Sequence, residues 1–198
     1  MERLSCKRVK IFFLYLLAAL FFVSVAKAQD ASLYEKFVQH YVANQKFMGS
    51  VLVARGNEIL FNKGLGSANL EWGIPNTPTT KFRIGSITKQ FTAASILLLT
   101  ERGKLKIDDP VKKYLPDAPR AWDKITIFNL LTHTSGIPNF TSFPGYWKER
   151  LFAHTPKEIV DIFRDKPLDF APGEKMSYSN SGYILLGYLL EKISGETY

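Results

Sequence analysis

The stretch FRIGSITK, residues 82–89, begins a long apolar helix that the hydrophobic pattern predicts from Ser86 to Glu101. Ser86 and Lys89 are three positions apart, so a helix places their side chains on one face, one turn from each other. The first turn of a helix carries the positive end of the helix dipole and favours Asp or Glu, so Lys89 does not favour stability there. A residue that breaks a local rule without visible compensation is a candidate for function.

The Ser-x-x-Lys spacing is a weak motif by itself, because Ser24 and Lys27 match it as well. One interpretation makes Ser86 a helix N-cap and Lys89 a solvated side chain, although a capping box would have Glu or Gln where Lys89 stands. The other makes Ser86 a nucleophile that a neighbouring amine activates, with the helix N-terminus directed at a developing oxyanion. The motif alone leaves both interpretations open.

A second candidate element is the turn-rich loop FAPGEKMSYSN, residues 170–180. Tyr178 and Asn180 are two positions apart, so an extended segment points both side chains the same way. A phenol close to a lysine ammonium has its pKa lowered and can carry a proton, and an amide can hold a substrate carbonyl or the lysine. A half-buried loop tyrosine is the simpler alternative for Tyr178. His133 follows a short helix, and we interpret it as a structural residue of the helix end.

The N-terminus has the pattern of an export signal. A basic segment, residues 1–10, precedes an apolar run, residues 11–26, and the small-x-small triplet Ala26-Lys27-Ala28. The run is shorter than the ~20 residues of a membrane span. We therefore expect a signal peptide over residues 1–28, cleavage after Ala28 and a periplasmic or secreted protein. An uncleaved signal would be its membrane anchor and would leave the same domain outside the cytoplasm.

Composition excludes several classes of function. Residues 1–28 hold five of the 26 Lys and Arg residues and one of the 18 Asp and Glu residues, so the formal charge of the rest is +4 instead of +8. That charge is mild and scattered, which argues against a nucleic-acid partner. The one cysteine, Cys6, lies in the predicted signal, and the three histidines have no metal-ligand spacing. We expect no disulfide, no metal and no cofactor.

The hydrophobic pattern predicts a helix and a hairpin followed by a mainly helical region. The expected helices cover residues 31–47, 86–101, 126–131, 156–164 and 181–193, and the expected strands cover residues 50–54, 58–61 and 64–70. The sequence RGNE, residues 55–58, predicts the tight turn of the hairpin. The first strand is apolar on both faces, so we expect both sides of the sheet to be covered. The helix at residues 86–101 is apolar nearly all round, which predicts a buried helix.

Three stretches together resemble the β-lactamase-related serine hydrolases: FRIGSITK at 82–89, LLTHTSG at 130–136, and PGEKMSYSN at 172–180. That group includes class C β-lactamases, low-molecular-weight penicillin-binding DD-peptidases and related esterases. The resemblance covers roughly residues 33–198 and implies an α+β fold of the β-lactamase/transpeptidase kind, with an antiparallel sheet flanked by helices, an all-α region, and the site between them. Residues 29–81 would be the first part of the sheet domain, and residues 82–198 the nucleophile helix and the helical domain.

The resemblance also implies roles for the candidate residues. Ser86 would be the acylated nucleophile, Lys89 its activating partner, Tyr178 the general base and later acid, and Asn180 a substrate-positioning residue. The family's third motif, a Lys-Thr-Gly or His-x-Gly triplet on a closing strand, would lie beyond the last residue, so we expect the sequence to be a fragment without those strands.

Two functional hypotheses follow from these residues. The first is an exported serine hydrolase that forms an acyl-enzyme with a β-lactam, a D-Ala-D-Ala-type peptidoglycan peptide or a small ester. The alternative is a non-catalytic exported binding or envelope-interaction module. The sequence does not address the oligomeric state.

Overall fold

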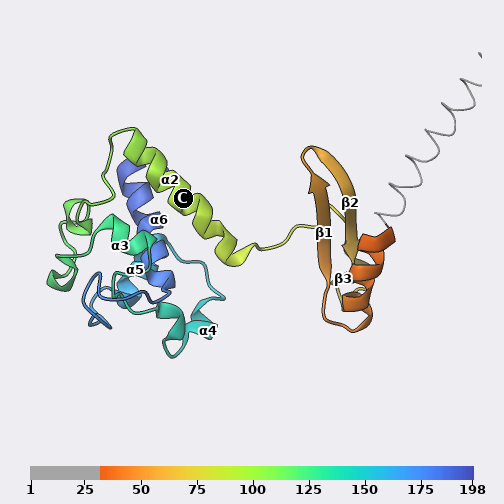
Figure 1. Cartoon of the computed structure of the whole chain (residues 1–198). Coiled ribbons are helices and arrows are strands. Elements are labelled where there is room, and N and C mark those ends of the chain that lie inside the picture. The colour runs from red at the N-terminus through yellow and green to blue at the C-terminus, as the bar shows by residue number, and fades with distance from the viewer. Residues whose placement is uncertain (1–31) are drawn as a thin grey trace, which may run out of the picture. The chain divides into compact units, whose positions relative to one another are not determined.

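The computed structural model describes residues 32–198, so the predicted signal peptide of residues 1–28 lies outside the described residues. The chain divides into two compact units, which meet in sequence between Arg83 and Ile84 (Figure 1). The first unit is a helix with a β-hairpin, and the second is helical. No helix in the described part of the chain is both long enough and apolar enough to cross a membrane.

The first unit is built on the predicted hairpin. Strands β1 (Gly49–Arg55) and β2 (Glu58–Leu65) pair antiparallel, with Val53 opposite Phe61 and a bulge after Val53. Gly56 in the turn has a φ of +57°, a conformation that glycine adopts at little cost. The helix of residues 32–43 lies beside the hairpin, because Tyr34 packs on Phe61 and Glu35 forms an ion pair with Lys63.

The third strand expected over residues 64–70 is found in part, with other bounds and another partner. Over these residues, β2 continues to Leu65, and a short strand β3 (Ser67–Asn69) pairs with β4 (Ile74–Pro75) as a separate ribbon. Among the described residues, the helix of residues 32–43 packs on the Phe61 face of the hairpin, and Leu52 is 60% exposed, so the expectation that both sides of the sheet are covered stays a prediction. A Cβ at Gly64 would lie 2.3 Å from the backbone of Asn76, so this position needs glycine.

The second unit packs its helices around α6 (Asn180–Ser194). The other helices are α2 (Thr88–Glu101), α3 (Ile127–Leu131), α4 (Tyr146–Glu149) and α5 (Pro156–Phe163). Helix α6 contacts α2, α3 and α5, and its Leu185, Leu186 and Leu189 are fully buried. Each such leucine contributes about 1.5–3 kcal/mol by leaving water. The core of this unit is therefore centred on α6.

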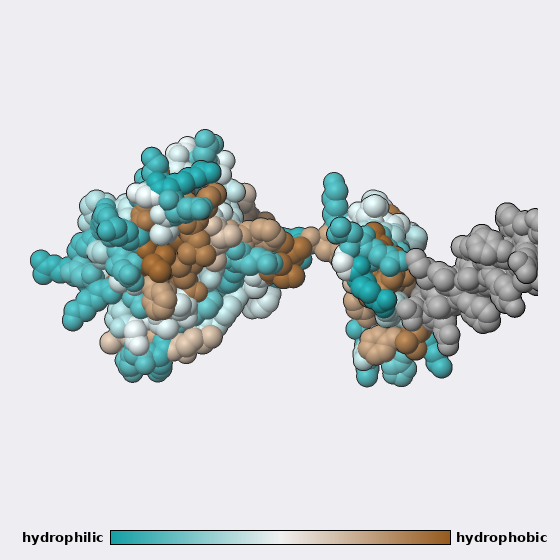
Figure 2. Space-filling view, turned by 45° about the horizontal axis from the view of Figure 1, so that its top comes forward, coloured by the Kyte–Doolittle hydropathy of each residue, from teal (hydrophilic) through white to brown (hydrophobic). Residues whose placement is uncertain are grey.

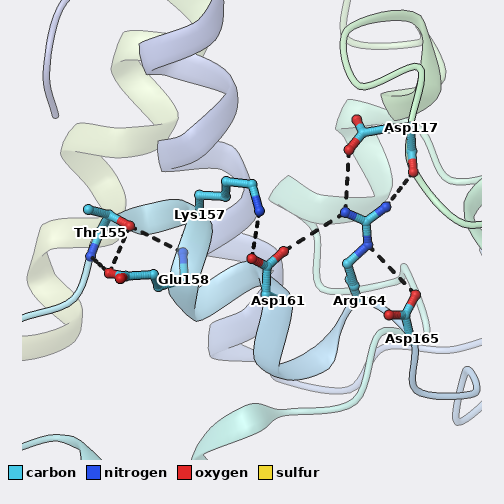
Figure 3. Close-up of polar contacts among 7 residues, drawn as sticks. All are labelled: Asp117, Thr155, Lys157, Glu158, Asp161, Arg164 and Asp165. Carbon is cyan, nitrogen blue, oxygen red and sulfur yellow. Dashed lines mark hydrogen bonds and ion pairs between the residues drawn. The ribbon is translucent and has the colours of Figure 1, made fainter.

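Local sequence explains where the short helices begin. Thr126 and Asn129 form a capping box at the start of α3, and Thr155 and Glu158 form one at the start of α5. Figure 3 shows the α5 box beside the ion pairs of Lys157 with Asp161 and of Arg164 with Asp117. The predicted ends are also found: Gly195 follows α6 with a φ of +79°.

The prediction of a buried helix at residues 86–101 is only half right. Helix α2 buries Thr92, Ile96 and Leu99 against its own unit, but Phe91 is 60% exposed and Leu97 is 53% exposed. Figure 2 shows hydrophobic residues gathered on the surface of this unit. The helix is apolar nearly all round, and the residues of the second unit cover one side of it.

Candidate active site

Ser86 and Lys89 lie where the chain enters α2. Ser86 is in a 3₁₀ turn, Gly85–Ile87, directly before the helix, and Lys89 is in the first helical turn. Neither Ile84 nor Ile87, the residues at the N-cap positions of the turn and of the helix, provides a side-chain cap. Ser86 is therefore not a helix cap. The Lys89 Nζ donates a hydrogen bond of 3.3 Å to the Ser86 Oγ, which is long for this type of bond.

The loop before α6 brings Tyr178 to the same serine. The Tyr178 hydroxyl and the Ser86 Oγ are 2.7 Å apart, although the two residues are 92 positions apart in the sequence. The Lys89 Nζ lies 4.9 Å from the centre of the Tyr178 ring, close enough for a cation–π contact. The Ser86 hydroxyl thus has the lysine on one side and the phenol on the other.

Asn180, the first residue of α6, completes the group. Its Oδ1 accepts a 2.8 Å hydrogen bond from the Lys89 Nζ. Its Nδ2 donates to the Asn139 Oδ1 and to the Thr141 Oγ1, each at 3.2 Å. The amide is therefore oriented from both ends, with its oxygen toward the lysine. The structure brings all four predicted site residues, Ser86, Lys89, Tyr178 and Asn180, into one hydrogen-bonded group.

Sequence reasoning missed Asn139 and Thr141. The Asn139 Oδ1 accepts from both the backbone N–H and the side-chain amide of Asn180. A signal was present, because Asn139 is only three positions after the LLTHTSG stretch. Polar loop residues are common, however, and the partner of Asn139 lies 41 positions away. Only the fold shows which loop amide meets Asn180.

The LLTHTSG stretch holds the loop that carries Tyr178. The carbonyl oxygens of His133, Thr134 and Gly136 accept hydrogen bonds of 2.8–2.9 Å from the N–H groups of Ser177, Gly173 and Asp169. Gly136 has a φ of +76°, and a Cβ there would lie 2.1 Å from a carbonyl oxygen of the loop, so glycine is required. Two of the three stretches that carry the resemblance, residues 130–136 and 172–180, are thus joined by backbone hydrogen bonds.

The charge of Lys89 acts on the neighbouring phenol. Burial raises the pKa of Tyr178, but the interactions with the Lys89 ammonium and the Ser86 hydroxyl outweigh it, so the pKa is lowered from its ordinary value of 10. The pKa of Tyr183, a phenol of α6, is raised by burial. Of the two phenols, Tyr178 is the one whose environment favours the ionised form.

The arrangement contains the groups that acyl-transfer chemistry needs. No cluster of His, Cys, Asp and Glu able to hold a metal ion occurs among residues 32–198. The site instead contains a hydroxyl, a phenol with a lowered pKa and a lysine, at the entrance of a helix. These are the parts of an activated serine nucleophile.

Comparison with known proteins identifies the family to which the chain belongs. The sequence profile of the beta-lactamase family matches residues 34–198, most of the chain. The chain belongs to the beta-lactamase family. Its architecture is accordingly part of the α+β fold of β-lactamases and transpeptidases, which the penicillin-binding protein structures that it matches also have.

Individual relatives agree with this assignment. The putative penicillin-binding protein PbpX of Bacillus subtilis (strain 168) is 37% identical over 161 residues, which are 81% of this chain and 39% of that protein. The crystal structure of a penicillin-binding protein from Bacillus halodurans matches with a TM-score of 0.70 and 38% identity over 80% of this chain and 50% of that one. The D-amino acid amidase of Ochrobactrum anthropi SV3, solved with L-phenylalanine, matches with a TM-score of 0.63 and 31% identity over 76% of this chain and 41% of that one. The chain thus spans half or less of the length of these relatives.

Proposed function

We propose that the complete gene product is an exported serine hydrolase that transfers acyl groups through an acyl-enzyme at Ser86. The observation that carries the proposal is the 2.7 Å contact between the Ser86 Oγ and the Tyr178 hydroxyl, with Lys89 bonded to both Ser86 and Asn180. Membership of the beta-lactamase family supports the class of reaction. The export signal is a proposal from residues 1–28 alone.

The hydrogen bonds suggest a division of roles. An ammonium has donors and no acceptor, and Lys89 donates to Ser86 and to Asn180. As an ammonium, Lys89 supplies positive charge beside Ser86. The phenolate form of Tyr178 is the neighbouring group that can accept the serine proton. Asn180 orients Lys89, and by analogy with the family its amide would also contact the substrate.

The reaction then has two halves. The Ser86 Oγ forms a bond to the acyl carbon as its proton passes to Tyr178. The bond to the leaving group breaks as Tyr178 gives that proton to the departing nitrogen or oxygen. Water then attacks the acyl-enzyme, Tyr178 takes a proton from the water and returns it to Ser86, and the acid product leaves. The entrance of α2 would stabilise the negative charge of the tetrahedral intermediates.

The substrates that we propose are β-lactams, D-Ala-D-Ala-type peptides of peptidoglycan, and small esters. The names of the relatives, penicillin-binding proteins and a D-amino acid amidase, favour amide substrates of D-configured or β-lactam type. Fold does not fix the substrate, so an ester substrate stays within the proposal.

Covalent labelling tests the nucleophile. The complete gene product is incubated with a fluorescent penicillin or a fluorophosphonate, and the bound label is quantified and located by mass spectrometry. Ser86→Ala should abolish the label, whereas Ser95→Ala, which changes an exposed serine of the same helix, should leave it intact. A Ser86→Ala protein that is labelled as well as the wild type would show that the nucleophile is wrongly assigned. A folded wild type that binds these molecules without any covalent label would favour the non-catalytic binding module.

A further inference from the structure

His133 lies against the phenol that we propose as the general base. The centres of the His133 and Tyr178 rings are 4.6 Å apart, with the ring planes 36° from parallel. The other neighbour is Tyr183 of α6, whose ring centre is 5.1 Å away. The His133 Nδ1 accepts a 3.2 Å hydrogen bond from the backbone N–H of Ser179, the residue directly after Tyr178. The imidazole thus contacts Tyr178 through its ring and through the adjacent backbone.

The backbone of His133 is also unusual. Its φ is +59°, in the left-handed region that few residues other than glycine adopt. Such a conformation costs about 1–3 kcal/mol and persists where surrounding contacts fix it. Here the His133 carbonyl accepts a 2.9 Å hydrogen bond from the N–H of Ser177. His133 therefore holds the residue before Tyr178 with its carbonyl and the residue after it with its imidazole.

We infer that His133 is a positioning residue for Tyr178, and that it performs this role as a neutral imidazole whose Nδ1 accepts the Ser179 N–H. The inference rests on the proposed function, because it assigns His133 to that same site. The interpretation from sequence makes His133 a cap of the preceding helix end, whereas in the structure its ring bonds to the N–H of Ser179.

The surroundings of His133 favour its neutral form. An Nδ1 that accepts a hydrogen bond leaves the ring proton on Nε2. Burial, and then the charge of Lys89 on α2, lower the pKa of His133 below its ordinary value of 6.5. The titratable groups packed against the ring are the phenols of Tyr178, from the loop, and Tyr183, from α6. The lysine lies 4.9 Å and 5.5 Å from the centres of those two rings.

Protonation would remove this arrangement. A proton on Nδ1 would face the Ser179 N–H, so two donors would oppose each other, and a second cation would stand near Lys89. We expect the segment at residues 177–179 to loosen and Tyr178 to lose its place beside Ser86. Acylation would then fall, as the pH drops through the lowered pKa of His133, more steeply than protonation of Tyr178 alone would make it fall. One pH unit below the pKa of His133 roughly a tenth of the rings would be neutral, which would lower the rate about tenfold further.

Two substitutions separate the contributions of the ring. His133→Asn keeps an acceptor and tolerates the left-handed backbone, but it does not titrate. His133→Phe keeps an aromatic ring against Tyr178 but has no acceptor for Ser179. His40→Asn, at an exposed histidine of the first unit, is the matched control. Thermal unfolding of each variant shows that it is folded.

The kinetic test measures the rate of Ser86 labelling from pH 5 to pH 8. We expect His133→Asn to stay within about tenfold of the wild type at pH 8. It should keep the fall in rate that protonation of Tyr178 causes, and lose the additional fall that follows the titration of His133. His133→Phe should be slower at every pH, and His40→Asn should match the wild type. Superimposable profiles for the wild type and His133→Asn would overturn the inference.

A spectroscopic test separates this inference from the proposed function. In protein carrying ¹⁵N-histidine and ¹³C-tyrosine, His133 should show the Nε2–H tautomer and a midpoint below 6.5, and the Tyr178 ring signal should shift with the same midpoint. His133→Asn should remove that shift. A His133 midpoint of 6.5 or above, or a Tyr178 signal that ignores it, would overturn the inference. Absence of covalent labelling in the wild type would overturn the proposed function, and the spectra would still decide the arrangement of His133 and Tyr178.

Discussion

Helices α3 and α5 begin with a threonine whose hydroxyl caps the helix, whereas α2 and α6 begin without a side-chain cap. The contrast is sharpest at α6, because its N-cap residue, Ser179, is of a type that caps well. The Ser179 hydroxyl is buried and has no hydrogen-bond partner among the described residues, and its N–H is bonded to His133. At α2, the hydroxyl and amine near the entrance bond to each other and to groups near α6.

This difference separates the polar groups that stabilise a helix start from the polar groups that form the candidate site. At α3 and α5 the polar groups of the helix entrance satisfy their own backbone, as capping requires. At α2 and α6 the polar side chains of the first turns bond across the two helices instead. The uncapped start of α6, at a serine that would normally cap it, therefore lies at the site among the described residues.

The largest expected effect is a fall in the rate of Ser86 labelling when Tyr178, in the loop before α6, loses its hydroxyl. Tyr178→Phe keeps the ring against His133 and removes the hydroxyl that lies 2.7 Å from the Ser86 Oγ. Loss of a general base lowers rates by about 10²–10⁴-fold, so we expect a fall of that size in the rate of Ser86 labelling. Stability should stay within about 0.5 kcal/mol of the wild type. Stopped-flow labelling and denaturant unfolding measure the two quantities. A labelling rate equal to that of the wild type would mean that Tyr178 is not the base.

A smaller fall in the labelling rate is expected when Asn139, which holds Asn180 in place, is substituted. Asn139→Ala removes the oxygen that accepts from both nitrogen atoms of Asn180. Partly buried donors left without a partner cost about 1–3 kcal/mol, and the Asn180 amide would be free to turn away from Lys89. We expect lower stability together with a labelling rate reduced by roughly tenfold. Thr100→Ala, which removes a hydroxyl bonded to the Ile96 carbonyl within α2, is a control outside the Asn180 contacts and should leave the labelling rate unchanged. Equal labelling rates for the wild type and Asn139→Ala would exclude the proposed support of Asn180.

A substitution at a capped helix start should lower stability and leave the labelling rate unchanged. Thr155→Ala removes the hydroxyl that accepts from the N–H of Glu158 in the α5 capping box. Loss of such a cap typically costs about 1 kcal/mol. Denaturant unfolding should show that loss, and the labelling rate should not change, because Thr155 is not among the residues that contact Ser86 or its partners. Thr155→Ser, which keeps the hydroxyl, should restore stability. A labelling rate that falls with Thr155→Ala would mean that the two kinds of entrance are not separate.

The smallest effect is expected on the exposed face of α5 (Figure 3). Lys157 and Asp161 form an ion pair of 2.6 Å one turn apart, and their side chains are 56% and 41% exposed. Water and salt screen such pairs strongly. Lys157→Ala should therefore change neither the labelling rate nor, at physiological salt, the unfolding midpoint measurably. A clear drop in the midpoint would show that polar contacts on this face matter as much as the cap.

The sequence could predict the local features because short-range rules govern them. The RGNE turn, the Thr126 cap, the Pro156 start and the Gly195 stop each depend on residues within about four positions of one another. The site could be predicted in part, since Ser86 and Lys89 share a helix turn and Tyr178 and Asn180 share a short segment. The sequence also assigned a helix start to Ser86, where the structure has a 3₁₀ turn before α2.

Long-range contacts account for what the sequence could not show. Asn139 meets Asn180 across 41 positions, and His133 meets Ser179 across 46, with no spacing rule to connect them. The burial of α2 was misjudged for a related reason, because an apolar helix does not show which of its faces its own unit covers. The hydrophobic pattern predicts whether a segment is a helix or a strand, whereas the long-range contacts of its residues depend on how the segments pack together.

The most direct test of the central claim crosses Ser86→Ala with Thr155→Ala. Each single variant and the double variant is measured twice, once for covalent labelling and once for the free energy of unfolding. We predict that Ser86→Ala abolishes labelling and leaves stability within about 0.5 kcal/mol, that Thr155→Ala costs about 1 kcal/mol and leaves labelling unchanged, and that the double variant shows both effects additively. A Ser86→Ala protein that loses about 1 kcal/mol and keeps its label would contradict the account, because Ser86 would then be a cap and not the nucleophile.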